Sequence, residues 1–293
     1  VKLWCDTETV PECEEITRAA GGKEKVIAFT GNAVAAGFTA SKIRWLKNHE
    51  PELFAKLATV LLPHDYLNFH LTGERKMEAG DASGTALFDV RNRCWSEALI
   101  AATDDSGVLR AALPEVIEAY QPVGTLLPSV ALKFGLPESV VVSAGGGDNM
   151  MAAIGTGNVK QGIVTASFGT SGTIFACADV PVIDPNGEVA AFCSSSGKWL
   201  PLICTMNVTV ATEQTRALLN LGVKEFDAEV AKAPAGAEGI RLIPYFNGER
   251  TPPLPKAKAT FSGISTANFT RPNVCRAAME GATSKLTIFR NFT

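Results

Sequence analysis

The chain has 293 residues, a formal net charge of −3, 46% hydrophobic residues and 19% charged residues. This length allows one large domain or two ordinary ones, with a hydrophobic core of good size. Lysine and arginine are dispersed rather than clustered, which argues against a nucleic-acid partner, and no apolar run is long enough to span a membrane. No signal peptide is visible, so we expect a cytoplasmic protein; the lack of an initiating methionine leads us to expect further residues upstream.

The cysteines and histidines predict reduced thiols and no zinc site. The seven cysteines are odd in number, and no pair has C-x-x-C spacing. Cys177, Cys193 and Cys204 lie in apolar contexts, which is typical of reduced thiols in a cytosolic protein. The three histidines form no ligand grouping with cysteines; they are His49, His64 and His70.

The first third of the chain is predicted to be mostly helical. Apolar spacing with start and stop signals predicts helices over residues 10–20, from Thr39 to near Pro51, and over residues 52–58 and 64–71. The apolar run at residues 60–62 is expected to be a short strand or an extended segment.

The sequence pattern changes from mostly helical to β-rich near Val141. Short β-rich runs separated by Gly, Pro and Asn predict strands within residues 140–145, 163–169, 173–178, 199–205 and 239–246, the last one buried. Helices are predicted over residues 210–221 and 273–289, with a loop at 231–239. The second of these helices has a face of small residues that allows close packing: Ala277, Ala278 and Gly281. The mixture indicates an α/β fold with a joint near residues 155–157.

Two glycine-rich turns within residues 142–173 carry the strongest functional signal. The first ends in a carboxylate, Asp148, and the second has small hydroxyl residues around two glycines, in the order Gly169, Thr170, Ser171, Gly172 and Thr173. Glycine lets backbone N–H groups approach a ligand closely, and such groups together with hydroxyls suit a phosphate chain. A carboxylate can take the proton of an attacking hydroxyl. Together the turns predict phosphoryl transfer from a nucleotide to an alcohol.

Each turn also has a purely structural interpretation. The first could be a plain turn in which Asp148 caps a helix over residues 149–154, a role compatible with catalysis. The second could be a tight β-hairpin between its two apolar flanks. The pairing of the two turns is what favours the functional interpretation.

Several ordered motifs resemble the FGGY carbohydrate kinases. Residues 37–49 are similar to the first signature of that family, and residues 261–264 followed by 276–281 are similar to the second. Further similarity, to the xylulokinase branch in particular, lies at residues 62–67, 72–74, 81–85, 145–149 and 248–252. The similarity is collinear over almost the whole chain.

The resemblance implies an actin-like ATPase (ribonuclease H-like) fold of two α/β domains with a cleft between them, incomplete in this chain. Residues 1–157 would be the remainder of an N-terminal sugar-binding domain, and residues 158–293 the first part of a C-terminal nucleotide-binding domain. The implied activity is phosphorylation of D-xylulose to D-xylulose 5-phosphate with ATP and Mg²⁺. The implied partners are therefore a ketose and ATP, with no nucleic acid and no membrane; a homodimer is left open.

The resemblance also implies roles for single residues on the sugar side. Asp148 matches the catalytic base, and Asn149 beside it could orient a sugar hydroxyl. Trp4 and Asp6 match a W-x-D motif near the sugar, although Trp4 could equally be a core residue. Lys42, in the first signature, is expected to be structural or ion-pairing.

On the nucleotide side, residues 167–173 match the second phosphate-binding loop of the family. Gly169 and Gly172 would bring N–H groups to the β- and γ-phosphates, and Thr170 and Ser171 would add hydroxyls. A separate turn of Glu249, Arg250 and Thr251 is expected to shape the cleft wall. Its first two side chains could simply pair with each other.

The departures from the family pattern bear on function. The D-x-G-T phosphate loop that precedes the W-x-D motif in the family has no counterpart here, and neither has the later adenosine turn, so we expect an interior portion of a longer kinase. Cys5 and Glu8 stand where relatives usually have Asn and Arg, which makes the sugar uncertain. Two alternatives therefore stay open: a kinase for another ketose, a polyol or a gluconate-like sugar, and a non-catalytic sugar-binding or regulatory remnant.

Overall fold

The computed structural model describes residues 2–4, 6–252, 254 and 256–284. The chain forms two compact units, Val1–Ile163 with Ala176–Pro201, and Val164–Phe175 with Leu202–Thr293. The first unit thus extends past residue 157 and takes in a later segment, because the chain returns to it after one hairpin. The expected division into sugar-binding and nucleotide-binding domains after residue 157 stays a prediction.

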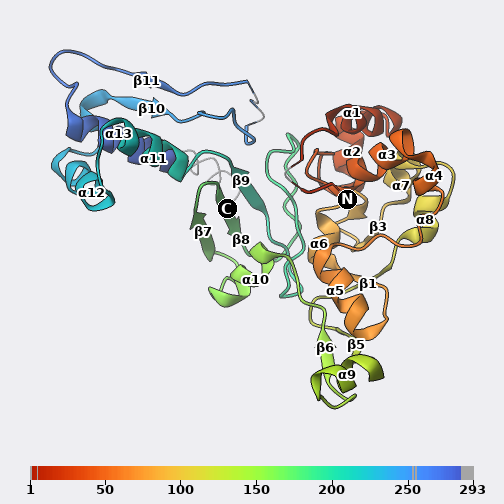
Figure 1. Cartoon of the computed structure of the whole chain (residues 1–293). Coiled ribbons are helices and arrows are strands. Elements are labelled where there is room, and N and C mark those ends of the chain that lie inside the picture. The colour runs from red at the N-terminus through yellow and green to blue at the C-terminus, as the bar shows by residue number, and fades with distance from the viewer. Residues whose placement is uncertain (1, 5, 253, 255, 285–293) are drawn as a thin grey trace. The chain divides into compact units, whose positions relative to one another are not determined.

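Helices at the N-terminal end of the first unit enclose its larger core (Figure 1). They are α1 (Val10–Ala19), α2 (Lys23–Thr30), α3 (Thr39–His49), α4 (Pro51–Phe54), α7 (Glu97–Thr103) and α8 (Val108–Ala112). Their apolar faces meet at fully or almost fully buried side chains such as Ile16, Val26, Ile43 and Leu99. Gly31 ends α2 in the left-handed conformation, which glycine adopts without steric cost.

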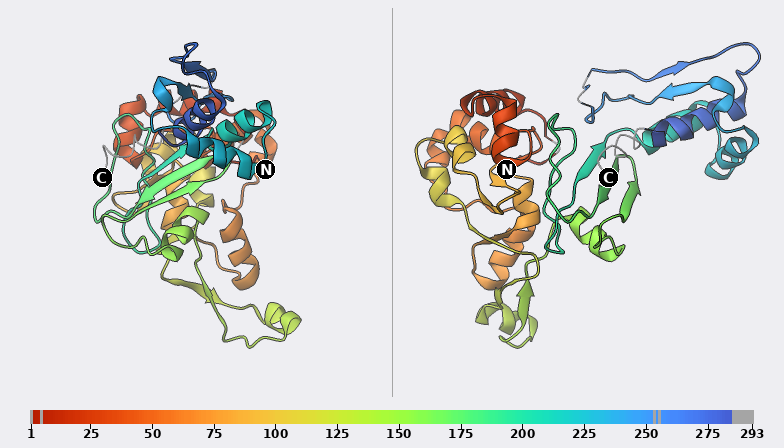
Figure 2. Two further views of the ribbon diagram at one scale, coloured as in Figure 1. Left: turned by 90° about the vertical axis from the view of Figure 1, so that its left-hand side faces the viewer. Right: turned by 180° about the vertical axis from the view of Figure 1, so that it is seen from behind.

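The rest of the first unit is built from short strands and the helices beside them. Its helices are α5 (Pro63–Thr72), α6 (Ala79–Ser83), α9 (Pro128–Phe134) and α10 (Asp148–Gly155). Its strand pairs are β1 (Lys76–Glu78) parallel to β4 (Glu115–Ile117), and, both antiparallel, β2 (Phe88–Asp89) with β3 (Cys94–Trp95) and β5 (Pro122–Thr125) with β6 (Val141–Ser143). Figure 2 shows that β5 and β6 form an arm with α9 at its tip. The chain leaves this arm through β6 and enters α10, which places the first glycine-rich turn.

The second unit combines a three-stranded sheet with a helical layer. The sheet has the order β7 (Val164–Phe168), β8 (Gly172–Ala176) and β9 (Leu202–Thr205). The helical layer holds α11 (Thr209–Leu218), α12 (Val223–Lys232), a 3₁₀ turn (Ala237–Gly239) and α13 (Arg271–Ser284), with β10 (Arg241–Ile243) antiparallel to β11 (Thr260–Ser262). The α13 helix packs on β10 through its face of small residues, because a Cβ atom on Gly281 would lie 2.4 Å from the carbonyl oxygen of Leu242. That predicted close packing is confirmed.

The structure agrees with most of the predicted elements and corrects four. The helix expected over residues 52–58 ends at Phe54. Residues 60–62 are extended without joining a sheet, which is one of the two forms expected for them. The strand expected over 239–246 covers only Arg241–Ile243 and is half-buried, since Arg241 and Ile243 are exposed. The loop expected from residue 231 begins after α12, a helix whose sequence gave no signal. The helix predicted over 273–289 starts at Arg271; residues 285–289 lie outside the described part.

The thiols follow the predicted pattern in part. Cys177, Cys193 and Cys275 are free and buried, whereas Cys204 is half-buried and Cys94 is exposed. No helix in the described part of the chain is long and apolar enough to cross a membrane.

Candidate functional site

Asp148 lies at the start of α10, directly after the glycine run Gly145–Gly147. Its side chain is exposed, and its Oδ1 accepts hydrogen bonds from the backbone N–H (2.8 Å) and the Nδ2 (3.0 Å) of Asn149. Gly147, not Asp148, is the N-cap, so the predicted capping role is corrected to that of the first helical residue. A carboxylate there is stabilised by the positive end of the helix dipole. Within the described residues Oδ2 has no hydrogen-bond donor, so it can receive a proton from a ligand.

Glycine is needed at residues 145–147 because side chains from other segments lie against this stretch of backbone. A Cβ atom on Gly147 would lie 2.9 Å from Oδ1 of Asp81, and one on Gly146 would lie 2.9 Å from the buried Oγ of Ser195. Gly145 adopts a φ of +76°, which other residues rarely adopt. The glycines therefore let the backbone pass close to the side chains of Asp81 and Ser195 just before it reaches Asp148.

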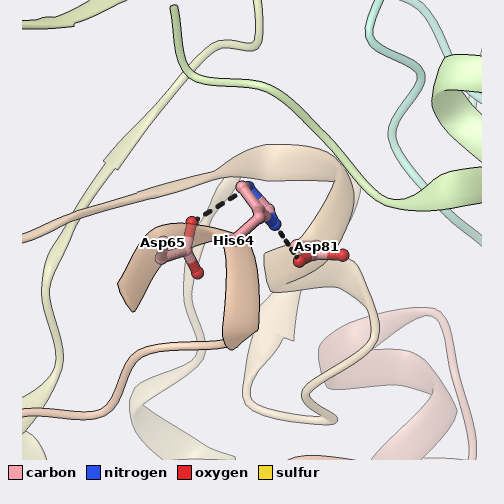
Figure 3. Close-up of side chains that lie close together, drawn as sticks. All are labelled: His64, Asp65 and Asp81. Atoms are coloured by element: carbon pink, nitrogen blue, oxygen red, sulfur yellow. Dashed lines mark ion pairs between the residues drawn. The ribbon is translucent and has the colours of Figure 1, made fainter. Parts of the chain in front are cut away.

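Beside Asp81 lies a half-buried histidine, His64, which is placed between two carboxylates (Figure 3). Nδ1 of His64, at the start of α5, lies 2.7 Å from Oδ2 of Asp81 in α6. Nε2 lies 3.1 Å from Oδ1 of Asp65; this contact is an ion pair whose direction does not meet hydrogen-bond geometry. Burial lowers the pKa of His64, but the two carboxylates outweigh burial and raise that pKa to about 10.

A second buried carboxylate, that of Glu78, lies near the same glycine run. Glu78 caps α6, accepting hydrogen bonds from the N–H groups of Gly80 (2.7 Å) and Asp81 (2.6 Å). Burial raises the pKa of Glu78 to about 7. Sequence reasoning assigned no role to His64, Glu78 or Asp81. Two of them lie in motifs, at residues 62–67 and 81–85, whose similarity to the kinase family was the available signal.

The cluster of His64, Asp65 and Asp81 has a composition that could hold a metal ion. In this structure the two imidazole nitrogens lie 2.7 Å from Asp81 and 3.1 Å from Asp65, which are ion-pair distances, and the two carboxylates raise the pKa of His64 to about 10. We therefore interpret the cluster as an ion-pair group that supports the glycine run.

Trp4 and Asp6 lie in the segment before α1, and α3 contacts this segment through Lys42 and Asp6. Trp4 is 67% exposed in this structure, so it lies outside the core of the described residues. The Asp6 carboxylate accepts from the N–H of Glu8 (2.9 Å) and lies 3.6 Å from Nζ of Lys2. Lys42 Nζ donates to the carbonyl oxygen of Asp6, which agrees with the structural role expected for that lysine.

This segment contains the two local departures from the family pattern, Cys5 and Glu8. Glu8 forms an ion pair with Lys2. Cys5 lies outside the described residues. The roles of Trp4, Asp6 and Asn149 toward a sugar stay predictions.

The second glycine-rich turn joins β7 to β8 in the second unit, so the hairpin interpretation describes its backbone. The N–H of Gly169 donates to the carbonyl oxygen of Ser171 (3.0 Å), which engages one of the two glycine donors predicted for phosphate. Gly172 is buried, and a Cβ atom there would lie 2.6 Å from Cγ2 of Val208, so its absent side chain serves packing. Thr170 and Ser171 are exposed and offer their hydroxyls to solvent.

The turn at residues 249–251 differs from its expected form. Glu249 is 2% exposed, and its carboxylate accepts from the backbone N–H groups of Met206 (2.7 Å) and Arg250 (2.8 Å). The Arg250 side chain instead reaches Sγ of Cys204, at 3.8 Å from Nη1. The pairing considered for these two side chains is thus replaced by hydrogen bonds from backbone N–H groups, which compensate the buried Glu249 carboxylate for lost water.

Comparisons with known proteins identify the family of this chain. Residues 1–155 match the model of the FGGY family of carbohydrate kinases, N-terminal domain. The xylulose kinase of Haemophilus influenzae is 46% identical over 285 residues, which cover 97% of this chain and 58% of that protein. The xylulose kinase of Escherichia coli is 36% identical over 283 residues, 95% of this chain and 57% of that protein. The chain thus spans less than two thirds of the length of these curated relatives.

Solved structures extend the agreement to the fold. A xylulose kinase from Brucella ovis matches with a TM-score of 0.89 and 32% identity, over 99% of this chain and 59% of that one. The glycerol kinase of Plasmodium falciparum, at 19% identity over 99% of this chain and 58% of that one, shares the fold with a TM-score of 0.86. The predicted sugar-kinase fold is confirmed, and this chain belongs to the FGGY family of carbohydrate kinases.

Proposed function

We propose that the protein containing this chain transfers the γ-phosphoryl group of ATP to the terminal hydroxyl of D-xylulose, giving D-xylulose 5-phosphate and ADP. The observation that carries the proposal is Asp148, an exposed carboxylate at a helix N-terminus with one oxygen open to a ligand. The names of the relatives, xylulose kinases at 46% and 36% identity, support this choice of sugar.

In the proposed reaction Asp148 acts as the base. The sugar hydroxyl oxygen bonds to the γ-phosphorus, the bond from that phosphorus to the β–γ bridging oxygen breaks, and ADP leaves with the bonding electron pair. The hydroxyl proton passes to Oδ2 of Asp148. The Oδ1 hydrogen bonds to Asn149 fix the carboxylate plane, so that Oδ2 is presented to the substrate.

The loop at residues 169–172 is proposed to hold the phosphates of ATP. Exposed Thr170 and Ser171 supply hydroxyls on a turn whose backbone is fixed by the hairpin. Mg²⁺ would arrive bound to the phosphates, whose charge it would neutralise.

The sugar contacts are proposed to come from the first unit. Asn149 lies beside the base, and the exposed indole of Trp4 offers an apolar face next to Asp6. Because the fold also carries glycerol kinase and gluconate kinase activities in structures of 19% and 22% identity, the sugar must be tested rather than read from the fold. We also propose a cytoplasmic location; the homodimer hypothesis is tested by light scattering.

The test uses the longest natural polypeptide that contains this sequence. Turnover with ATP is measured across D-xylulose, other ketopentoses, polyols and gluconate, and D-xylulose is expected to give the highest kcat/KM. Asp148→Asn should lower kcat by about 10²–10⁴-fold, the usual contribution of a general base. The control is Asp105→Asn, which changes an exposed carboxylate paired with Lys47. Near-normal turnover of Asp148→Asn would refute the assignment, and a preference for another sugar would replace D-xylulose.

A further inference from the structure

Glu249 is a buried carboxylate with no assigned part in the chemistry. Its Oε1 accepts from the N–H groups of Met206 (2.7 Å) and Arg250 (2.8 Å), and its Oε2 lies 3.3 Å from Nδ2 of Asn207. Burying a carboxylate is costly unless hydrogen bonds compensate for the lost water. Three donors from two separate segments meet this requirement, so Glu249 ties its own turn to the residues that follow β9.

Asn207 makes the reciprocal connection. Its side chain is fully buried; Nδ2 donates to the carbonyl oxygen of Gly248 (2.6 Å), and Oδ1 accepts from the N–H of Asn247 (3.2 Å). The turn at residues 247–250 and the segment at 206–207 therefore hold each other through both side chains. Neither segment can shift without breaking buried hydrogen bonds.

The segment held in this way continues directly into contact with the phosphate loop. The N–H of Val208 donates to the carbonyl oxygen of Thr170 (3.1 Å), and the N–H of Thr209 donates to that of Gly169 (3.0 Å). The Val208 side chain also fills the space beside Gly172. Two successive carbonyl groups of the loop thus point toward the start of α11.

This orientation fixes the direction of two amide N–H groups. In a planar trans peptide the C=O and the following N–H point in opposite directions. Because the carbonyls of Gly169 and Thr170 point toward α11, the N–H groups of Thr170 and Ser171 point away from it. Both residues are exposed, so these N–H groups, rather than that of Gly169, are the ones available to an anion.

We propose that Glu249 is a positioning residue that, through the segment 206–209, aims the N–H groups of Thr170 and Ser171 at the phosphates of the nucleotide. The inference rests on the proposed function, since it names the groups that bind the nucleotide there. It makes the turn at 249–251 part of the nucleotide site without any contact to the ligand.

An amide cannot replace the Glu249 carboxylate. In Glu249→Gln either the new NH₂ group faces Nδ2 of Asn207, another donor, or it faces the N–H groups of Met206 and Arg250. Asn207 cannot turn its amide over to compensate, because both of its ends are engaged. The substitution keeps the size of the side chain and removes at least one buried hydrogen bond.

The experiment compares Glu249→Gln with Glu225→Gln in the longest natural polypeptide. Glu225 is an exposed carboxylate of the same unit that accepts from the N–H of Gly222, so it controls for the chemical change. Amide hydrogen exchange at Val208 and Thr209 is measured without nucleotide, and binding of MgADP is measured by calorimetry. Glu249→Gln should speed exchange at both amides and weaken ADP binding by about 10-fold, as expected for one lost hydrogen bond to a charged group. KM for D-xylulose should stay within about 2-fold, and Glu225→Gln should match the unmodified protein.

Unchanged exchange together with unchanged ADP affinity would overturn the inference, and so would an equal loss of sugar and ADP affinity, which would mark a merely structural role. If Glu249→Gln does not fold, Asn207→Ala tests the same connection from the other side and should give the same pattern. Failure of the proposed function would appear separately, as absence of ATP-dependent turnover in the unmodified protein. The exchange measurement needs neither turnover nor nucleotide, so it tests the positioning on its own.

Discussion

Gly147→Ala isolates the contact between the glycine run and the ion-pair cluster beneath it. The backbone of Gly147 has a φ of −59° and a ψ of 153°, which alanine adopts without strain. The new methyl group would lie 2.9 Å from Oδ1 of Asp81 and 3.2 Å from Sδ of Met150. The first distance is about 0.4 Å shorter than the closest ordinary contacts between carbon and oxygen. The effect of the substitution is therefore steric and local.

The overlap cannot be relieved by a free side-chain end, because the other oxygen of Asp81 is held 2.7 Å from His64. Either the ion pair breaks or α10 moves, and both disturb the residue that follows, Asp148. Overpacking of this kind costs about 1–3 kcal/mol. For a domain of about 150–250 residues, each kcal/mol lowers Tm by about 2–4 °C. We therefore expect a fall in Tm of a few degrees with a loss of kcat.

The assay pairs thermal unfolding with ATP-dependent turnover on D-xylulose. Gly155→Ala is the matched control, because it lies at the other end of α10 and a Cβ atom there would meet nothing within 4 Å. That control should leave Tm unchanged or slightly raised, since alanine favours helix over glycine. If Gly147→Ala keeps both the Tm and the kcat of the unmodified protein, the cluster does not support the glycine run, and the reasoning is refuted.

Two further substitutions test the charge of the cluster and the packing of the second unit. Burial opposes the charge of His64, but Asp65 and Asp81 raise its pKa from 6.5 to about 10, so the folded state binds the proton more tightly than the unfolded state. This stabilisation is fully present below pH 6.5 and is lost as the pH rises through 10, so His64→Gln should lower Tm much more at pH 6 than at pH 10.5; equal losses at the two values would contradict it. Gly281→Ala would place a Cβ atom 2.4 Å from the carbonyl oxygen of Leu242, a backbone atom that cannot turn aside. Thermal unfolding should show a loss of about 3 kcal/mol, and an unchanged Tm would mean that α13 does not pack on β10 as described.

The parts of the site that could be predicted from the sequence are those formed by residues that are neighbours in the chain. Asp148 follows its glycines directly, and the loop at residues 169–172 is one turn between two apolar runs. Periodicity likewise predicted α1, α3, α5 and α11, and three of these helices place a side chain in a core: Ile16 of α1, Ile43 of α3 and Ala211 of α11. It gave no signal for α12, in which Phe226 is the only buried residue and its neighbours are polar.

What could not be predicted depends on contacts between distant segments. His64 and Asp81 meet the glycine run from positions more than sixty residues earlier in the chain, and no local pattern reports that contact. For Glu249 the nearest charge, Arg250, was the obvious partner in the sequence. In the fold the Glu249 carboxylate is buried and accepts from backbone N–H groups, which compensate for the water it has lost, whereas Arg250 is exposed.

Glycine has the same role in the two glycine-rich turns, and their sequences alone do not show it. Glycine was interpreted as the residue that brings backbone N–H groups to a ligand, yet Gly147 and Gly172 are each closed in by protein atoms, Asp81 in one case and Val208 in the other. Their missing side chains admit neighbouring side chains rather than substrate. The exposed residues beside them are Asp148, which follows Gly147, and Ser171, which precedes Gly172. In each turn, therefore, glycine sets the position of the backbone, and an adjacent residue presents the polar side chain that we propose for the chemistry.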